Sequence, residues 1–262
     1  MVLYLHELKS NLKSFLIWTA CVGGMCFACI LLYSSLQDSM SDMLDAYSNM
    51  GAFSTALGMD QLSIATLSGF YATEIGIMHS LGGAMFAALT GAVMISKEEA
   101  GHTAEFLNVF PIGRKAVLME KYAAFLTLVL LFNLFCVIMY VIGFAILGEE
   151  IETKQFLLYH LAQILMQVEI GTICFMISAF VKKNLIGAGL GIAVIFYAMD
   201  LMCRIIPAIK ILKYITPFYY SNASDIFVNK KIDTGMALIG VAILVVSFVI
   251  ALIQYEKKDL AV

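Results

Sequence analysis

The sequence predicts an all-α membrane protein with six transmembrane helices. Of its 262 residues, 61% are hydrophobic, 13% are charged and only 3 are proline, and the mean hydropathy is +0.91. Soluble domains are about half apolar and a quarter charged, so this composition excludes a water-soluble or disordered chain. The net charge of −3 provides no basic field for a nucleic acid. Lipid is therefore an expected partner, and nucleic acid is not.

Six stretches are long enough to cross a bilayer, whose hydrocarbon core of about 30 Å requires roughly 20 apolar helical residues. They cover residues 15–36, 70–95, 122–147, 155–181, 185–206 and 236–255. An even number of spans places both termini on one side. Ten of the 16 basic residues lie before the first span, between spans 2 and 3, between spans 4 and 5, or after the last span. Basic residues favour the cytoplasmic side, so both termini are expected there.

The last outer connection departs from this charge rule. Five basic residues surround it: Arg204, Lys210, Lys213, Lys230 and Lys231. The side and the fold of residues 207–235 therefore stay open at this point. The first outer connection, residues 37–69, is acidic and periodically apolar, and we expect short helices in it.

The chain before the first span predicts a helix at the inner membrane surface. Leu5, Leu8, Leu12 and Phe15 recur at helical spacing, with polar residues on the other faces. This pattern is typical of an amphipathic interfacial helix, expected over residues 1–14.

The cytoplasmic loop over residues 97–121 holds four acidic and four basic residues. Residues 98–109 can form a short helix, which Pro111 would end because its ring removes a donor and restricts the preceding residue. Phe106 and Phe110 leave an apolar edge beside the charges. A solvated hairpin explains the loop through the charge rule alone, whereas an aromatic edge bracketed by charge is also typical of a docking surface.

Three segments of the chain resemble ABC-2 type transporter permeases. The order Glu98-Glu99, Gly101, Thr103, Glu105-Phe106-Leu107, Pro111, Gly113-Arg114 and Lys121 is similar to the loop that follows the second span in that family. The stretch Ile215-Thr216-Pro217-Phe218-Tyr219-Tyr220 resembles its outer segment before the last span. The ending Tyr255-Glu256-Lys257-Lys258-Asp259-Leu260 resembles its C-terminus. The span number, the length and the N-terminal helix also agree, so the resemblance covers nearly the whole chain.

The resemblance implies a non-catalytic permease subunit in a bacterial plasma membrane. A separate ATP-binding subunit, which would hold ATP and Mg²⁺, would dock on a coupling helix in the 97–121 loop, and this chain would bind no cofactor. The expected docking residues are Glu98, Glu99, His102, Glu105, Phe106, Phe110 and Arg114. A second permease, identical or paralogous, would complete the transporter. Some relatives have a large external domain. The short external connections of this chain are more similar to those of permeases that export peptide toxins and antimicrobial peptides.

Polar groups inside the spans are candidates for function, since they are costly in a bilayer. They are Glu74, Asn133, Gln167 and Glu169. They would either line a conduit or, with Glu169 bonded to Asn133 or a glutamine, fasten spans 3 and 4 together. His79 lies about 140° around the helix from Glu74, so the two do not form a metal pair. Cys26 and Cys29 form a CxxC within an apolar helix, so no metal site is predicted.

Two further patterns concern packing. Asp200 and Arg204 are spaced for an i,i+4 salt bridge. Small residues at Ala20, Gly24, Gly187 and Gly191 allow close approach of helices, either within one subunit or, as the resemblance implies for spans 1 and 5, at a dimer seam.

Three functions therefore stand beside one another. The first is the permease subunit of an ATP-driven exporter, with an amphipathic peptide as cargo. The second is a stand-alone ion-coupled transporter or channel that uses Glu169 and Glu74. The third is an intramembrane enzyme. It ranks last because the sequence contains no paired catalytic constellation.

Overall fold

The computed structural model describes residues 2–36, 51–59, 61–101, 113–183 and 185–258. Every regular element in these ranges is helical, and six helical runs are long and apolar enough to cross a membrane. The runs are Val2–Leu36, Leu67–Met94, Arg114–Leu147, Thr153–Phe180, Ile186–Ile205 and Thr234–Lys257. The predicted all-α class with six membrane-spanning helices is confirmed.

The first two runs are each built from three consecutive segments. The first comprises α1 (Val2–Trp18), the π-helical η1 (Thr19–Gly23) and α2 (Gly24–Leu36), and the second comprises α5 (Leu67–Phe70), the π-helical η3 (Tyr71–Ile75) and α6 (Gly76–Met94). The other four are α9 (Arg114–Leu147), α10 (Thr153–Phe180), α11 (Ile186–Ile205) and α13 (Thr234–Lys257). Short helices connect them: α4 (Ala52–Leu57), α7 (Ser96–Ala100), the 3₁₀ helix η4 (Pro207–Tyr214) and α12 (Ala223–Asn229).

The N-terminal segment differs from its prediction. Over the described residues 2–14 no break separates an interfacial helix from the first span, because α1 continues through η1 into α2. A helix of 35 residues is roughly 50 Å long at 1.5 Å per residue, which exceeds the hydrocarbon core. The sequence places no proline in this run to separate two helices. Its first turns instead pack against α9, where Glu7 is buried.

The core is centred on α6 and α10, which lie against each other along their length. Glycines make this contact close: a Cβ added at Gly91 would lie 2.1 Å from the carbonyl oxygen of Gly171. The helices α9, α11 and α13 surround this pair, and α1 with α2 packs on α9. Large apolar side chains remain exposed on the outer faces of α9 and α13, among them Leu130, Ile138, Val141, Val245, Val246 and Ile253. Such faces suit lipid.

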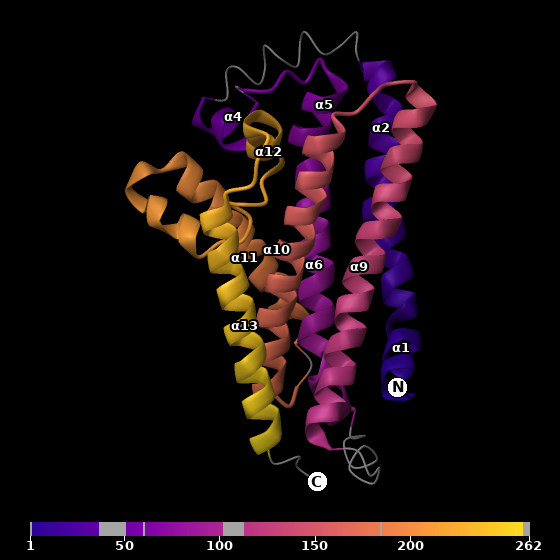
Figure 1. The fold of residues 1–262 in the computed structure, drawn as a ribbon, viewed down its shortest axis with the longest axis vertical. Coiled ribbons are helices and arrows are strands. Elements are labelled where there is room, and N and C mark those ends of the chain that lie inside the picture. The colour runs from indigo at the N-terminus through magenta and orange to yellow at the C-terminus, as the bar shows by residue number, and fades with distance from the viewer. Residues whose placement is uncertain (1, 37–50, 60, 102–112, 184, 259–262) are drawn as a thin grey trace.

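The two ends of the bundle differ in content (Figure 1). The start of α1, the end of α13 and the junction between α6 and α9 lie at one end, and α4, α5 and α12 lie at the other. Both chain ends on one side agree with an even number of spans. The first end is called the charged end below, because α7 and its ion pairs lie there.

Polar side chains define the segment between α11 and α13. Asn222 caps α12 by accepting a hydrogen bond from the backbone N–H of Asp225 (3.1 Å), and Asp233 caps α13 by accepting one from Met236 (3.2 Å). Caps of this kind satisfy backbone donors that a helix start leaves unpaired. They fix where both helices begin.

Candidate functional site

The charged end holds a network of ion pairs around α7. This helix follows α6 after a single residue and carries Lys97, Glu98 and Glu99 in succession. Each of the three side chains has a partner on a different part of the fold. The sequence predicted these residues to lie on a solvated or docking surface, whereas the structure directs them into the bundle.

Lys121 of α9 is at the centre of the network and is fully buried. Its ammonium group donates to Glu7 Oε1 at 2.7 Å, to the carbonyl oxygen of Met94 at 2.9 Å and to Glu98 Oε1. The other carboxylate oxygen of Glu7 accepts from Lys97. Both Glu7 and Lys121 have 0% exposure. Two acids and two bases thus balance one another, with Glu7 and Lys121 fully buried and Lys97 and Glu98 partly exposed, and they join α1, α7 and α9.

A second connection joins α7 to the C-terminal end of α13. The ammonium group of Lys258 lies 2.7 Å from Glu99 Oε2 and donates to the carbonyl oxygen of Val181, just after α10, at 3.1 Å. Arg114 donates to the carbonyl oxygens of Glu256 (2.9 Å) and Lys258 (2.8 Å). The short α7 is therefore held by α1, α9 and the end of α13 together.

Burial dominates the electrostatics of Glu98. It raises the pKa of the Glu98 carboxyl above its ordinary value of 4.5, while the neighbouring Lys121 acts in the opposite direction. A carboxylate in this position costs free energy to desolvate and recovers part of it from its base.

The predicted docking residues divide into two groups. His102, Glu105, Phe106 and Phe110 lie outside the described residues, as does most of the helix expected over 98–109. Glu98 and Glu99 are mostly buried in the ion pairs above, and Arg114 is exposed but bonded to the C-terminal backbone. Their role in docking stays a prediction. The sequence interpretation missed Glu7, Lys121 and Lys258 as partners, because each lies far along the chain from α7.

The membrane interior contains a separate chain of hydrogen bonds. Asn133 of α9 donates to Gln167 Oε1 of α10 at 2.7 Å, and its own Oδ1 lies 3.2 Å from His79 Nε2 of α6. The other ring nitrogen of His79 lies 3.0 Å from the hydroxyl of Tyr140. Since Asn133 Oδ1 can only accept, Nε2 carries the proton and Nδ1 accepts from Tyr140. These contacts join three spans.

The packing interpretation expected Glu169 to bond to Asn133 or to a glutamine. The structure shows neither bond. Instead, Glu169 Oε2 accepts a hydrogen bond of 2.8 Å from the hydroxyl of Tyr220, in the outer segment before the last span. The carboxylate faces α13, where a Cβ added at Gly240 would lie 2.5 Å from it. Glu74, the remaining intramembrane candidate, is half-buried on η3.

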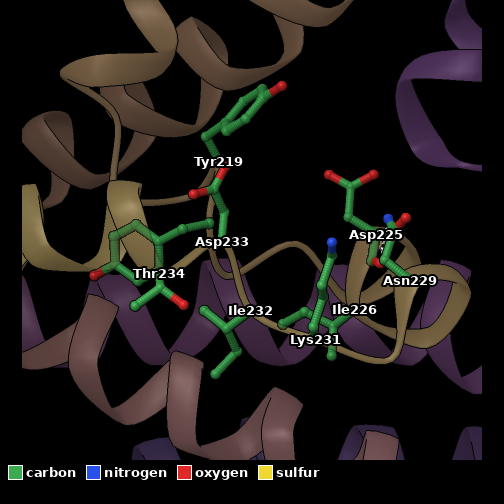
Figure 2. Close-up of a pocket in the computed structure, with 9 residues that line it drawn as sticks. Tyr219, Asp225, Ile226, Asn229, Lys231, Ile232, Asp233 and Thr234 are labelled. Carbon is green, nitrogen blue, oxygen red and sulfur yellow. Dashed lines mark hydrogen bonds between the residues drawn. The ribbon is translucent and has the colours of Figure 1, made fainter.

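The salt bridge between Asp200 and Arg204 is present, with Nε of the arginine 3.0 Å from the carboxylate. Arg204 also pairs with Asp225 at 2.7 Å and donates to the carbonyl oxygen of Tyr219 at 3.2 Å. These contacts hold α12 and the outer segment on the end of α11. Beside them is a recess of about 480 Å³, around which the charged ends of Asp225, Lys231 and Asp233 lie (Figure 2).

The predicted seam residues lie on open faces of the chain. A Cβ added at Gly24, Gly187 or Gly191 would meet no atom within 4 Å, and Ala20 is exposed. By contrast, Gly189 packs inward, since a Cβ there would lie 2.9 Å from the carbonyl oxygen of Ala88 on α6. The small residues of α11 thus serve two purposes, one inside the chain and one on an uncovered surface.

Comparison with known proteins identifies a family. The family model described as "ABC-2 family transporter protein" matches residues 1–260. No curated protein matches the chain.

Proposed function

The chain belongs to the ABC-2 family of transporter proteins, and from this premise we propose that it is the permease subunit of an ATP-driven exporter in a bacterial plasma membrane. Membership in this family makes the chain a transporter membrane subunit and implies an ATP-binding partner. Export, coupling to ATP and the nature of the cargo are the proposed part. We also propose that both termini are cytoplasmic.

The ion pairs of α7 carry this proposal. A short helix at the cytoplasmic loop would be of little use for coupling if it could move independently of the spans. Here Lys121 connects α7 to α1 and α9, and Lys258 connects it to the end of α13. A displacement of α7 would therefore reach three spans through buried contacts that have little freedom to yield.

The proposed mechanism has two permeases and two ATPase subunits. ATP and Mg²⁺ would be held by the ATPases, whose closure around the nucleotide would push on the 97–121 loop. The network around Lys121 would pass this push to α1 and α9. The spans would then change from an inward-facing to an outward-facing arrangement. ATP would drive this two-state change because it binds more tightly to one of the two states.

A second copy of the permease is proposed to meet the first along α2 and α11. Support comes from the open surface at Gly24, Gly187 and Gly191, where a partner helix could approach closely. The polar intramembrane groups Asn133, Gln167 and Glu169 are all buried within one chain. A path between two copies would thus be mainly apolar, which favours an amphipathic peptide over an ion as cargo.

The stand-alone ion-coupled transporter remains a second candidate because of one observation. Tyr220, which donates to Glu169, also lines the outer recess of about 480 Å³. An ion or a proton entering from that side would approach the Glu169 carboxylate through this tyrosine. This candidate predicts transport that requires an ion gradient and no ATP.

Purification of the tagged chain from its host tests the proposal. We expect a stoichiometric ATPase subunit to co-purify and to hydrolyse ATP. Glu105→Lys reverses a charge in the loop and leaves Lys97, Glu98 and Glu99 of α7 unchanged in sequence, and we expect it to release the ATPase. Glu149→Lys is the matched control, since Glu149 is an exposed acid between α9 and α10, at the other end of the bundle. A chain that purifies alone would overturn the proposal and favour the ion-coupled transporter.

A further inference from the structure

The segment between the end of α11 and the start of α13 carries an excess of positive charge. From residue 200 to residue 234 it contains five basic and three acidic side chains. This was the exception to the charge rule in the sequence. The structure accounts for one of the bases, because Arg204 is shared by Asp200 and Asp225.

Within the described part of the chain, the other four bases have no such partner. Among the described residues, Lys210, Lys213, Lys230 and Lys231 form no ion pair with a carboxylate. Lys213 lies over aromatic rings, with its ammonium 4.9 Å from the ring centre of Tyr214. The acids nearby are occupied: Asp225 pairs with Arg204, and Asp233 caps α13.

Apolar side chains are exposed in the same segment as Lys210 and Lys213. Ile211 of η4 is 71% exposed, and Tyr214 and Ile215 are about half exposed. In Figure 1, an orange segment of the chain projects sideways from the bundle near α11. A helix that exposes isoleucines next to lysines is costly in water but suits a membrane interface, where the apolar part enters the acyl region and the ammonium groups reach the headgroups.

The outer recess beside this surface carries mixed charge. Lys231 lines it together with the carboxylates of Asp225 and Asp233 (Figure 2), and the amide of Asn229 already donates to the carbonyl oxygen of Asp225 at 2.8 Å. Two carboxylates would repel a phosphate group there, so the recess itself is not the phosphate site.

We propose that η4, together with Lys230 and Lys231, is a binding surface for anionic phospholipid. The lysines contact the headgroup phosphates, and Ile211, Tyr214 and Ile215 insert among the acyl chains. This surface concerns lipid alone, so it does not depend on the ATPase partner. It also gives a physical reason for basic residues on the side of the membrane where the charge rule does not expect them.

The test is a titration of the purified full-length protein with phosphatidylglycerol and with phosphatidylcholine, followed by native mass spectrometry. We expect preferential binding of phosphatidylglycerol that weakens as salt is added. The variant K210Q/K213Q/K230Q/K231Q should lose roughly 600-fold in affinity, since each of the four lysines near an anionic surface contributes about a fivefold gain. Binding of phosphatidylcholine should change little.

Two control variants keep the result interpretable. K210R/K213R/K230R/K231R retains the charge and should retain the lipid, whereas Lys154→Gln removes an exposed lysine outside this surface and should have little effect. Equal binding of both lipids, or unchanged affinity in the glutamine variant, would overturn the proposal. So would loss of self-association in the glutamine variant without loss of lipid, which would assign the surface to a second copy.

Discussion

Removing the buried ammonium group of Lys121 is the most direct test of the charged end. Lys121→Met keeps a long side chain but leaves the carboxylates of Glu7 and Glu98 facing one remaining base, Lys97. Loss of one partner from a buried ion pair costs about 3–5 kcal/mol, because the remaining charge stays desolvated. With 2–4 °C for each kcal/mol in chains of this size, we expect the unfolding midpoint to fall by roughly 6 °C or more.

The assay is thermal unfolding of the purified protein in detergent, with a matched control on the same helix. Lys115 lies 3.2 Å from Glu256, but its side chain is 69% exposed. Exposed pairs contribute about 0–1 kcal/mol, so Lys115→Met should unfold within about 4 °C of the parent. Both variants remove one lysine from α9 and differ mainly in burial.

A triple variant separates the loss of an ion pair from a loss of packing. Lys121→Met combined with Glu7→Gln and Glu98→Gln removes the uncompensated charges and should recover most of the lost stability, as when a buried ionic cluster is replaced by uncharged groups. If Lys121→Met unfolds at the same temperature as Lys115→Met, or if the triple variant is no more stable than Lys121→Met, the reasoning is refuted.

Three further predictions concern other parts of the fold. Glu169→Gln keeps an acceptor for the tyrosine hydroxyl, so ATP-driven transport should stay within about twofold of the parent, whereas abolished transport would support the ion-coupled candidate. Gly187→Leu should weaken self-association, measured by cross-linking, with little change in the unfolding midpoint, whereas Gly189→Leu should lower that midpoint because the site is filled by α6. Burial raises the pKa of Glu98, so its ionisation opposes folding. The stability of the parent relative to Glu98→Gln should therefore fall as pH rises above 4.5 towards the folded-state pKa, and a difference that grows with pH in the parent's favour would contradict this.

The sequence predicted the spans well because a bilayer imposes a simple requirement. Each of the six apolar stretches had to supply about 20 helical residues, and composition alone reveals such stretches. The helical run that contains the first span is longer than the predicted span. Amphipathic spacing in residues 1–14 is the same for a helix lying on a membrane and for one packed on a neighbour, and the structure shows Glu7 buried where α1 packs on α9.

The side-chain contacts at the candidate site were harder to predict from the sequence than the helices were. Asp200 and Arg204 are four residues apart, so helical geometry alone indicated their salt bridge. Glu7 and Lys121 are separated by 114 residues, and no local pattern connects them. The partner of Glu169 was not predicted for a related reason. The sequence placed Glu169 in the correct span, but it did not indicate that the side chain faces α13, where Tyr220 donates to it.

The burial of the acids in α7 changes what the loop over residues 97–121 can do. A side chain committed to an internal ion pair cannot also present its charge to a docking partner without paying the cost of leaving its base. Glu98 and Glu99 are committed in this way to Lys121 and Lys258. Contact with an ATPase would then fall to other parts of the loop, while α7 would transmit the movement. Charge complementarity with the ATPase should accordingly be sought at Glu105 rather than at the two acids that the sequence made most conspicuous.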